Sequence, residues 1–122
     1  MEHNILASLA FNVSRMQLLK KDNNLDQVDN LHEIPGAAAV FAICGRVNGY
    51  AANPRYVGAT TNLRQEIQNL FDTGDCVGQF MNSIKLKELL YEVVSEDQLE
   101  NKKTEWESKF SPKCNEAMNE VY

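Results

Sequence analysis

The sequence predicts a small α+β domain in which helices flank a three-stranded antiparallel sheet. Three observations lead to this fold class. Two apolar, β-rich segments meet at an Asn-Gly turn, segments with helical periodicity alternate with the predicted strands, and the 122 residues suffice for one core but not for two. Hydrophobic residues make up 43% of the chain and charged residues 24%, which argues against wholesale disorder.

An extra N-terminal helix is predicted over residues 5–21, because apolar residues recur there every three or four positions. Lys20 and Lys21 at its end suit the negative end of the helix dipole. We expect its apolar face to pack on the rest of the domain, and the alternative is a homodimer or a partner contact through the same face. The positions that form this face are Leu6, Leu9, Val13, Met16 and Leu19.

A β-hairpin is predicted after Pro35-Gly36, which ends any helix in the preceding polar segment. Residues 37–44 are apolar throughout and include β-forming types. Asn48-Gly49 then favours a tight hairpin turn, and the return strand is expected over residues 54–59.

The second half of the chain predicts helix, strand and helix. Thr61 or Asn62 should cap a helix over residues 62–71, and a short helix or turn is expected between residues 77 and 84. Residues 85–94 alternate well enough for the third strand. A last helix should run from residue 95 to about Phe110, anchored on the sheet by Trp106, and end before Pro112.

Four segments resemble motifs of the GIY-YIG endonuclease domain. They are Ala39-Val40-Phe41, Arg55-Tyr56-Val57-Gly58, Thr60-Thr61-Asn62-Leu63-Arg64 and Pro112-Lys113-Cys114-Asn115. The resemblance covers about Ile34 to Asn115, so residues 34–122 are expected to form a GIY-YIG-like domain and residues 1–33 its N-terminal helical extension. It implies phosphodiester hydrolysis in which tyrosines and a helix arginine handle water and phosphate and a glutamate holds Mg²⁺.

The family's catalytic positions are mostly altered in this chain. The resemblance implies an inactive domain, because Tyr56 is the retained residue, while Phe41 lacks the first motif's hydroxyl, Glu66 replaces the helix arginine and Lys103 replaces the metal-binding glutamate. An alternative for Glu66 is an ion pair with Lys103 across the old cleft. The remaining equivalent positions are Ala59 and Leu70.

Two alternatives remain open at this point. The first is a divergent DNA endonuclease that uses Tyr56 and Glu100 with Mg²⁺ or Mn²⁺. If this alternative does not hold, no cofactor is expected. The second is a nucleic-acid-binding module without cleavage. The net charge of −5 disfavours broad phosphate binding, although a local basic cleft is compatible with it. The basic candidates are Arg55, Arg64, Lys85, Lys87 and Lys103.

The partner and the location are expected from composition. We expect a protein partner and no membrane, because no apolar run approaches the length that spans a bilayer. Cys44, Cys76 and Cys114 form no paired or metal-binding pattern and are interpreted as reduced thiols. The N-terminus has no basic segment before its apolar residues. Together these features predict a cytoplasmic protein.

Overall fold

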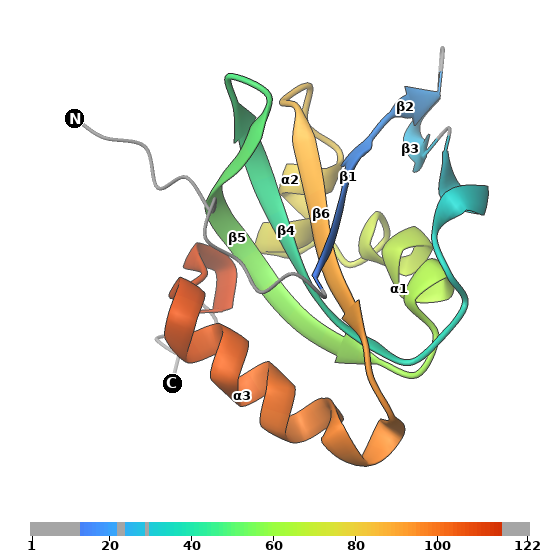
Figure 1. Cartoon of the computed structure of the whole chain (residues 1–122). Coiled ribbons are helices and arrows are strands. Elements are labelled where there is room, and N and C mark those ends of the chain that lie inside the picture. The colour runs from blue at the N-terminus through green and yellow to red at the C-terminus, as the bar shows by residue number, and fades with distance from the viewer. Residues whose placement is uncertain (1–12, 22–23, 29, 116–122) are drawn as a thin grey trace.

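The central layer of the molecule is an antiparallel sheet. The computed structural model describes residues 13–21, 24–28 and 30–115. Within these ranges the sheet contains β1 (Ser14–Leu18), β4 (Ala39–Val47), β5 (Tyr50–Thr60) and β6 (Lys87–Val93). Their order across the sheet is β1-β6-β4-β5 (Figure 1). A separate small sheet pairs β2 (Lys20–Lys21) with β3 (Asn24–Val28).

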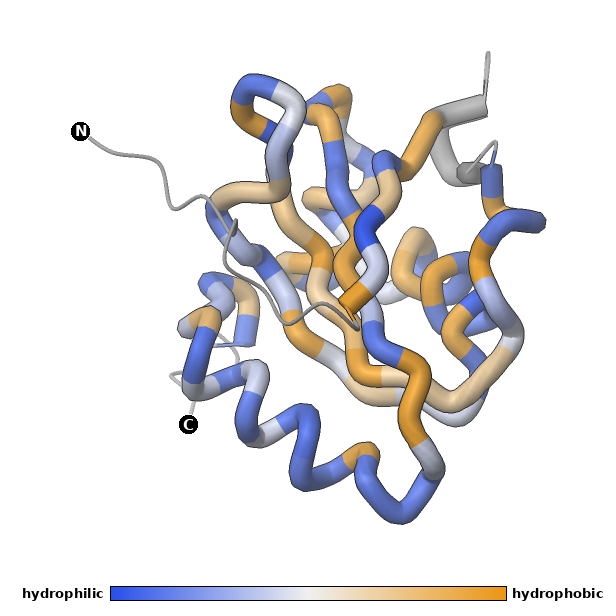
Figure 2. Tube along the Cα trace, viewed as in Figure 1, coloured by the Kyte–Doolittle hydropathy of each residue, from blue (hydrophilic) through white to orange (hydrophobic). Residues whose placement is uncertain are grey.

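Helices cover both faces of the central sheet (Figure 1). The helices α1 (Leu63–Leu70) and α2 (Cys76–Met81) lie on one face, and α3 (Leu99–Phe110) lies on the other. Short 3₁₀ turns, η1 (Leu31–Glu33) and η2 (Glu96–Gln98), precede β4 and α3. Figure 2 shows hydrophobic residues concentrated along the central strands and hydrophilic residues along most of α3. The α+β class is therefore confirmed.

Alternate residues of β4 enter two different cores. Phe41 and Ile43 pack in the cluster that contains the inner faces of α1 and α2, whereas Val40 and Ala42 pack in the cluster that contains Trp106 of α3. Because successive side chains of a strand point to opposite faces, both faces of β4 are buried. This explains why the segment is apolar throughout rather than alternating. The predicted anchoring role of Trp106, which is 3% exposed, is confirmed.

The predicted hairpin turn, the N-terminal cap of α1 and the end of the last helix are also confirmed. Asn48 and Gly49 have φ of 54° and 82°, the positive values that a two-residue hairpin turn with the favoured twist requires. Asn62 caps α1, because its Oδ1 accepts a hydrogen bond of 3.1 Å from the Gln65 amide. The α3 helix ends at Phe110, two residues before Pro112.

Strand β5 carries irregularities that the sequence did not predict. Three successive residues of β4 pair with Tyr56, Pro54 and Ala52 of β5. At each of these steps β5 moves by two residues while β4 moves by one. Arg55 and Asn53 are therefore the extra residues of bulges, which bend a strand and redirect its side chains. Asn53 also has a positive φ of 55°.

The N-terminal helix prediction is wrong over residues 14–18, which form strand β1 and make the sheet four-stranded within the described ranges rather than three-stranded. Residues 5–12 lie outside the described residues. Tertiary pairing with β6 decides the conformation: Met16 and Leu18 pack in the core on the α1 side, and Arg15 lies 3.7 Å from the Glu88 carboxylate. Strand β1, which belongs to the predicted 1–33 extension, thus lies in the same sheet as β6 of the predicted 34–122 domain.

The prediction of three reduced cysteines is wrong for two of them. Cys76 and Cys114 form a disulfide with a Cα–Cα distance of 5.5 Å, across 38 positions of sequence. Cys44 is free and buried. The sequence spacing could not show that α2 and the segment after α3 meet. Because disulfides persist mainly in oxidising compartments, the thiol argument for a cytoplasmic location does not hold for this pair.

The described part of the chain contains no helix that is both long enough and apolar enough to cross a membrane.

Candidate functional site

Phe41 and Tyr56 lie together on neighbouring strands, beside Gly58. Their ring centroids are 5.9 Å apart, and a Cβ placed on Gly58 would come within 2.7 Å of the Phe41 ring. Phe41 is fully buried, whereas Tyr56 is half-buried. The structure therefore brings the two motif aromatics into contact, with Gly58 providing the space between them.

The Tyr56 hydroxyl lies in acidic surroundings. Burial raises its pKa above the usual value, and the negative charges of Glu66, Asp75 and Glu107 raise it further. Each of these carboxylates disfavours a second negative charge at this position. Glu107 was not among the sequence candidates. The available signal was its position one helical turn after Lys103 on α3, which places both on the same flank of that helix.

The other candidate positions that followed from the resemblance lie in different environments. Leu70 is buried in the core, Ala59 is half-buried on β5, and Glu100 is exposed in the first turn of α3. Among the described residues, no ion pair joins Glu66 to Lys103. The alternative ion pair across the cleft is therefore not formed in this structure.

No group of three or more histidine, cysteine, aspartate or glutamate side chains is arranged to hold an ion in the residues that the structure describes.

Comparisons with protein-family models, with curated proteins and with solved structures find no match to the chain. The GIY-YIG resemblance consequently depends on the sequence motifs quoted above.

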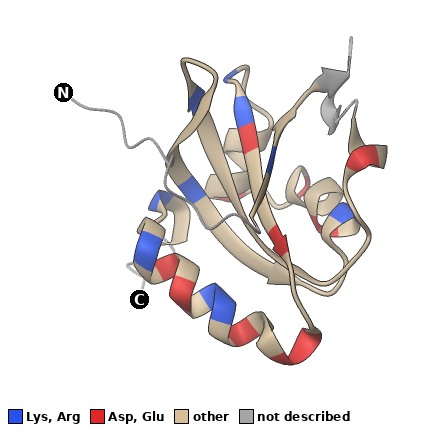
Figure 3. Ribbon diagram, in the orientation of Figure 1, with Lys and Arg blue, Asp and Glu red and all other residues tan. Residues whose placement is uncertain are grey.

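The basic candidates separate into different environments. Lys87 is only 3% exposed and its ammonium donates to the backbone oxygens of Ser83 and Lys85, at 2.8 and 2.6 Å. Arg64 donates to the Ile34 carbonyl at 2.7 Å and so fastens α1 to the preceding loop. Lys103 lies on α3, where Figure 3 shows acidic and basic residues interleaved. Arg55 and Lys85, in contrast, line one cavity.

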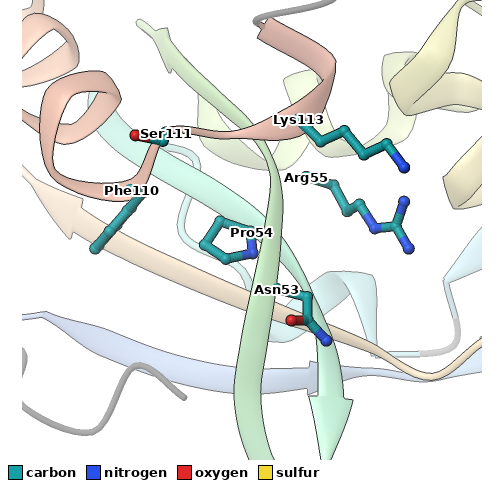
Figure 4. A pocket seen from close by; sticks show the side chains of 6 residues that line it. All are labelled: Asn53, Pro54, Arg55, Phe110, Ser111 and Lys113. Atoms are coloured by element: carbon teal, nitrogen blue, oxygen red, sulfur yellow. The ribbon is translucent and has the colours of Figure 1, made fainter. Parts of the chain in front are cut away.

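Two adjoining cavities form what we call the basic cleft. The first has a volume of about 320 Å³ and the second about 310 Å³, and both are lined by Asn53 and Arg55. Figure 4 shows the Arg55 and Lys113 side chains running in the same direction, from β5 and from the segment after α3. The remaining lining residues are Pro54, Phe110, Ser111 and Lys113 in the first cavity, and Gly45, Arg46, Phe80, Lys85 and Leu86 in the second.

The cations of the basic cleft differ in how far they are neutralised. Arg46 donates to Glu88 at 2.6 Å, and this carboxylate, which also lies near Arg15, is buried. Arg55, Lys85 and Lys113 form no ion pair with any carboxylate of the described residues. The cleft therefore presents positive charge on a chain whose net charge is −5.

Proposed function

We propose that this chain is a catalytically inactive GIY-YIG-like domain that acts as a binding or accessory module. The observation that carries the proposal is the charge around Tyr56. Glu66 occupies the position that the family gives to an arginine, and after burial its carboxylate is the largest cause that raises the pKa of the one retained tyrosine. A phosphate at this position would meet negative charge. At 4 Å, two like charges cost about 4 kcal/mol at an effective dielectric constant of 20.

The fully buried Phe41 supports the same proposal. Its ring fills the space beside Gly58 and contributes no hydroxyl for proton transfer. Glu100, the ligand that an active alternative would need, is exposed and is not among the charges that influence Tyr56. A protein partner remains part of the proposal and is to be identified by experiment.

A nuclease assay tests the proposal. The purified chain is incubated with supercoiled plasmid and with single-stranded DNA, in the presence of Mg²⁺ or Mn²⁺. We expect no nicking or cleavage above a buffer control. Metal-dependent cleavage that disappears in Tyr56→Phe would overturn the proposal, since a contaminating nuclease would not respond to that substitution.

A restoration experiment tests the motif alignment separately. Phe41→Tyr, Glu66→Arg and Lys103→Glu are combined in one variant, which returns the family's residue types to these positions. Metal-dependent nicking by this variant, with none by the wild type, supports the alignment. A variant that folds normally but neither binds metal nor nicks DNA contradicts it.

A further inference from the structure

We propose that the basic cleft binds a ligand carrying two neighbouring phosphate groups, with one group in each cavity and Arg55 between them. This goes beyond the proposed function, which names no ligand. The two cavities share Arg55 and Asn53, so a single ligand can contact both. Their volumes of about 320 and 310 Å³ lie at the lower end of the range for small-ligand pockets.

The charged residues that line the basic cleft favour an anionic ligand. Lys113 lines the first cavity, Lys85 and Arg46 line the second, and Arg55 lines both. No aspartate or glutamate is among the lining residues that the described ranges contribute, although acidic residues outnumber basic ones by 17 to 12 in the whole chain. Arg46 is partly neutralised by Glu88, so the cations available to a ligand are Arg55, Lys85 and Lys113.

Arg55 is held in a suitable orientation. Its guanidinium carbon lies 4.9 Å from the centroid of the Phe80 ring, which restrains the guanidinium by a cation–π contact. A guanidinium held by its face keeps its N–H edges for oxygens, and these edges match phosphate in a bidentate arrangement. The bulge at Arg55 places this side chain at the junction of the two cavities.

The backbone of the first cavity is unusual. Asn53 and Ser111 have φ of 55° and 46°, and both residues line this cavity. Ser111 is the left-handed C-cap residue of α3, and Asn53 is an extra residue of a β5 bulge, so local structure accounts for both values. These two residues come from different elements, since Asn53 belongs to β5 and Ser111 follows α3.

Two neighbouring residues of β5, Arg55 and Tyr56, have surroundings of opposite charge. Tyr56 is influenced by three carboxylates of the described residues, namely Glu66, Asp75 and Glu107, whereas Arg55 lines one cavity with Lys113 and another with Lys85. The position that the family uses for phosphate therefore repels it, and the adjoining cleft attracts it.

Calorimetric titration tests the inference. The probes are pyrophosphate, inorganic phosphate, an eight-residue oligothymidylate and an eight-residue glutamate peptide, each at low and at moderate salt. We expect either pyrophosphate or the oligonucleotide to bind, more tightly than inorganic phosphate. Arg55→Gln should weaken that binding about tenfold or more, as expected for the loss of a charge-assisted contact. Lys85→Gln and Lys113→Gln should each weaken it less.

Lys109→Gln is the matched control, because Lys109 is an exposed lysine at the end of α3 that does not line the cleft. Pyrophosphate binding that depends on Arg55 identifies a free diphosphate group as the ligand chemistry. Arg55-dependent oligonucleotide binding without pyrophosphate binding identifies successive phosphodiesters. Equal affinity for the glutamate peptide, no binding of any probe, or equal effects of Arg55→Gln and Lys109→Gln would overturn the inference.

The two proposals fail independently. Plasmid nicking would contradict the proposed inactivity but would leave a binding result at Arg55 intact. A lack of binding to all four probes would overturn the phosphate site and would leave the nuclease result unchanged. Far-UV circular dichroism and urea unfolding of each variant establish that it is folded before titration.

Discussion

The side-chain amide of Asn115 pairs with both backbone groups of Val57. The Val57 amide donates to Asn115 Oδ1 at 2.8 Å, and Asn115 Nδ2 donates to the Val57 carbonyl at 3.1 Å. Val57 belongs to β5, an edge strand of the central sheet. Asn115 therefore occupies hydrogen-bonding groups that an edge strand would otherwise present to another chain. Glu107 accepts a further hydrogen bond of 3.0 Å from Asn115 Nδ2 and fixes the amide.

We predict that Asn115→Ala lowers the free energy of unfolding by about 1–3 kcal/mol, because it leaves part-buried backbone groups of Val57 without these partners. Urea denaturation followed by circular dichroism measures the change. Asn101→Ala is the control, since Asn101 is an exposed asparagine on α3, and its effect should stay within about 0.5 kcal/mol. Equal effects of the two substitutions would contradict the role assigned to Asn115.

Gly58→Ala is expected to destabilise the fold by about 1–3 kcal/mol, the usual cost of overpacking a core. The added methyl group would lie 2.7 Å from the Phe41 ring and 3.0 Å from the Tyr56 ring. Gly45→Ala provides the comparison, because its nearest neighbour, the Ala52 carbonyl oxygen, is at an ordinary 3.5 Å. Thermal unfolding measures the stability of both variants. A Gly58→Ala protein that is as stable as Gly45→Ala would exclude the close contact of the added methyl group with the Phe41 ring.

The Cys44 thiol should make stability depend on alkaline pH. Burial, and secondarily the Glu88 charge, raises its pKa from 9.0 to about 12. A folded-state pKa above the unfolded value stabilises the fold below pH 9. This contribution is lost as the pH rises toward 12, because the unfolded chain then releases the proton first.

Comparison of wild type with Cys44→Ala isolates this effect from other titrating groups. The stability advantage of the wild type over the variant should shrink by about 1 kcal/mol between pH 8 and pH 10. Urea unfolding at the two pH values provides the measurement. A difference between the two proteins that does not change with pH would show that Cys44 ionises normally in the folded state.

Removing the Cys76–Cys114 disulfide should destabilise the protein by about 4 kcal/mol on the chain-entropy scale, because the bond closes a loop across 38 positions. Mass spectrometry of the unreduced protein should show the bond, and a reducing agent should lower the melting temperature. The Cys76→Ala/Cys114→Ala variant should not respond to the reductant. If the wild type is equally insensitive, the bond makes no contribution to stability.

Local features of the sequence were sufficient for three turns and element ends between Ala39 and Phe110. The Asn48-Gly49 turn, the Asn62 cap and the stop before Pro112 each depend on residues a few positions apart, and the structure has all three. Backbone preferences of Gly, Pro and Asn act within one turn and can therefore be read from adjacent residues.

The conformation of residues 14–18 could not be predicted from the sequence, because it depends on tertiary contacts. Val13, Met16 and Leu19 fit a helical period, but Met16 and Leu18 also fit the two-residue period of a strand. Pairing with β6 and the approach of Arg15 to Glu88 select the strand. Such pairing joins segments about seventy positions apart, and the local pattern carries no information about it.

Some properties of the candidate site could also be predicted from the sequence, whereas others depend on the tertiary structure. Residue identities alone singled out Phe41, Glu66 and Lys103 as departures from the GIY-YIG pattern and Tyr56 as its retained tyrosine, and they included Arg55 and Lys85 among the basic candidates. Only the fold decided that Arg55 shares cavities with Lys85 and Lys113 and that Lys87 is buried. It also decided that Cys76 meets Cys114. The physical reason is that a sequence specifies which groups are present, whereas charge, burial and bonding depend on distances that arise only when remote segments pack together.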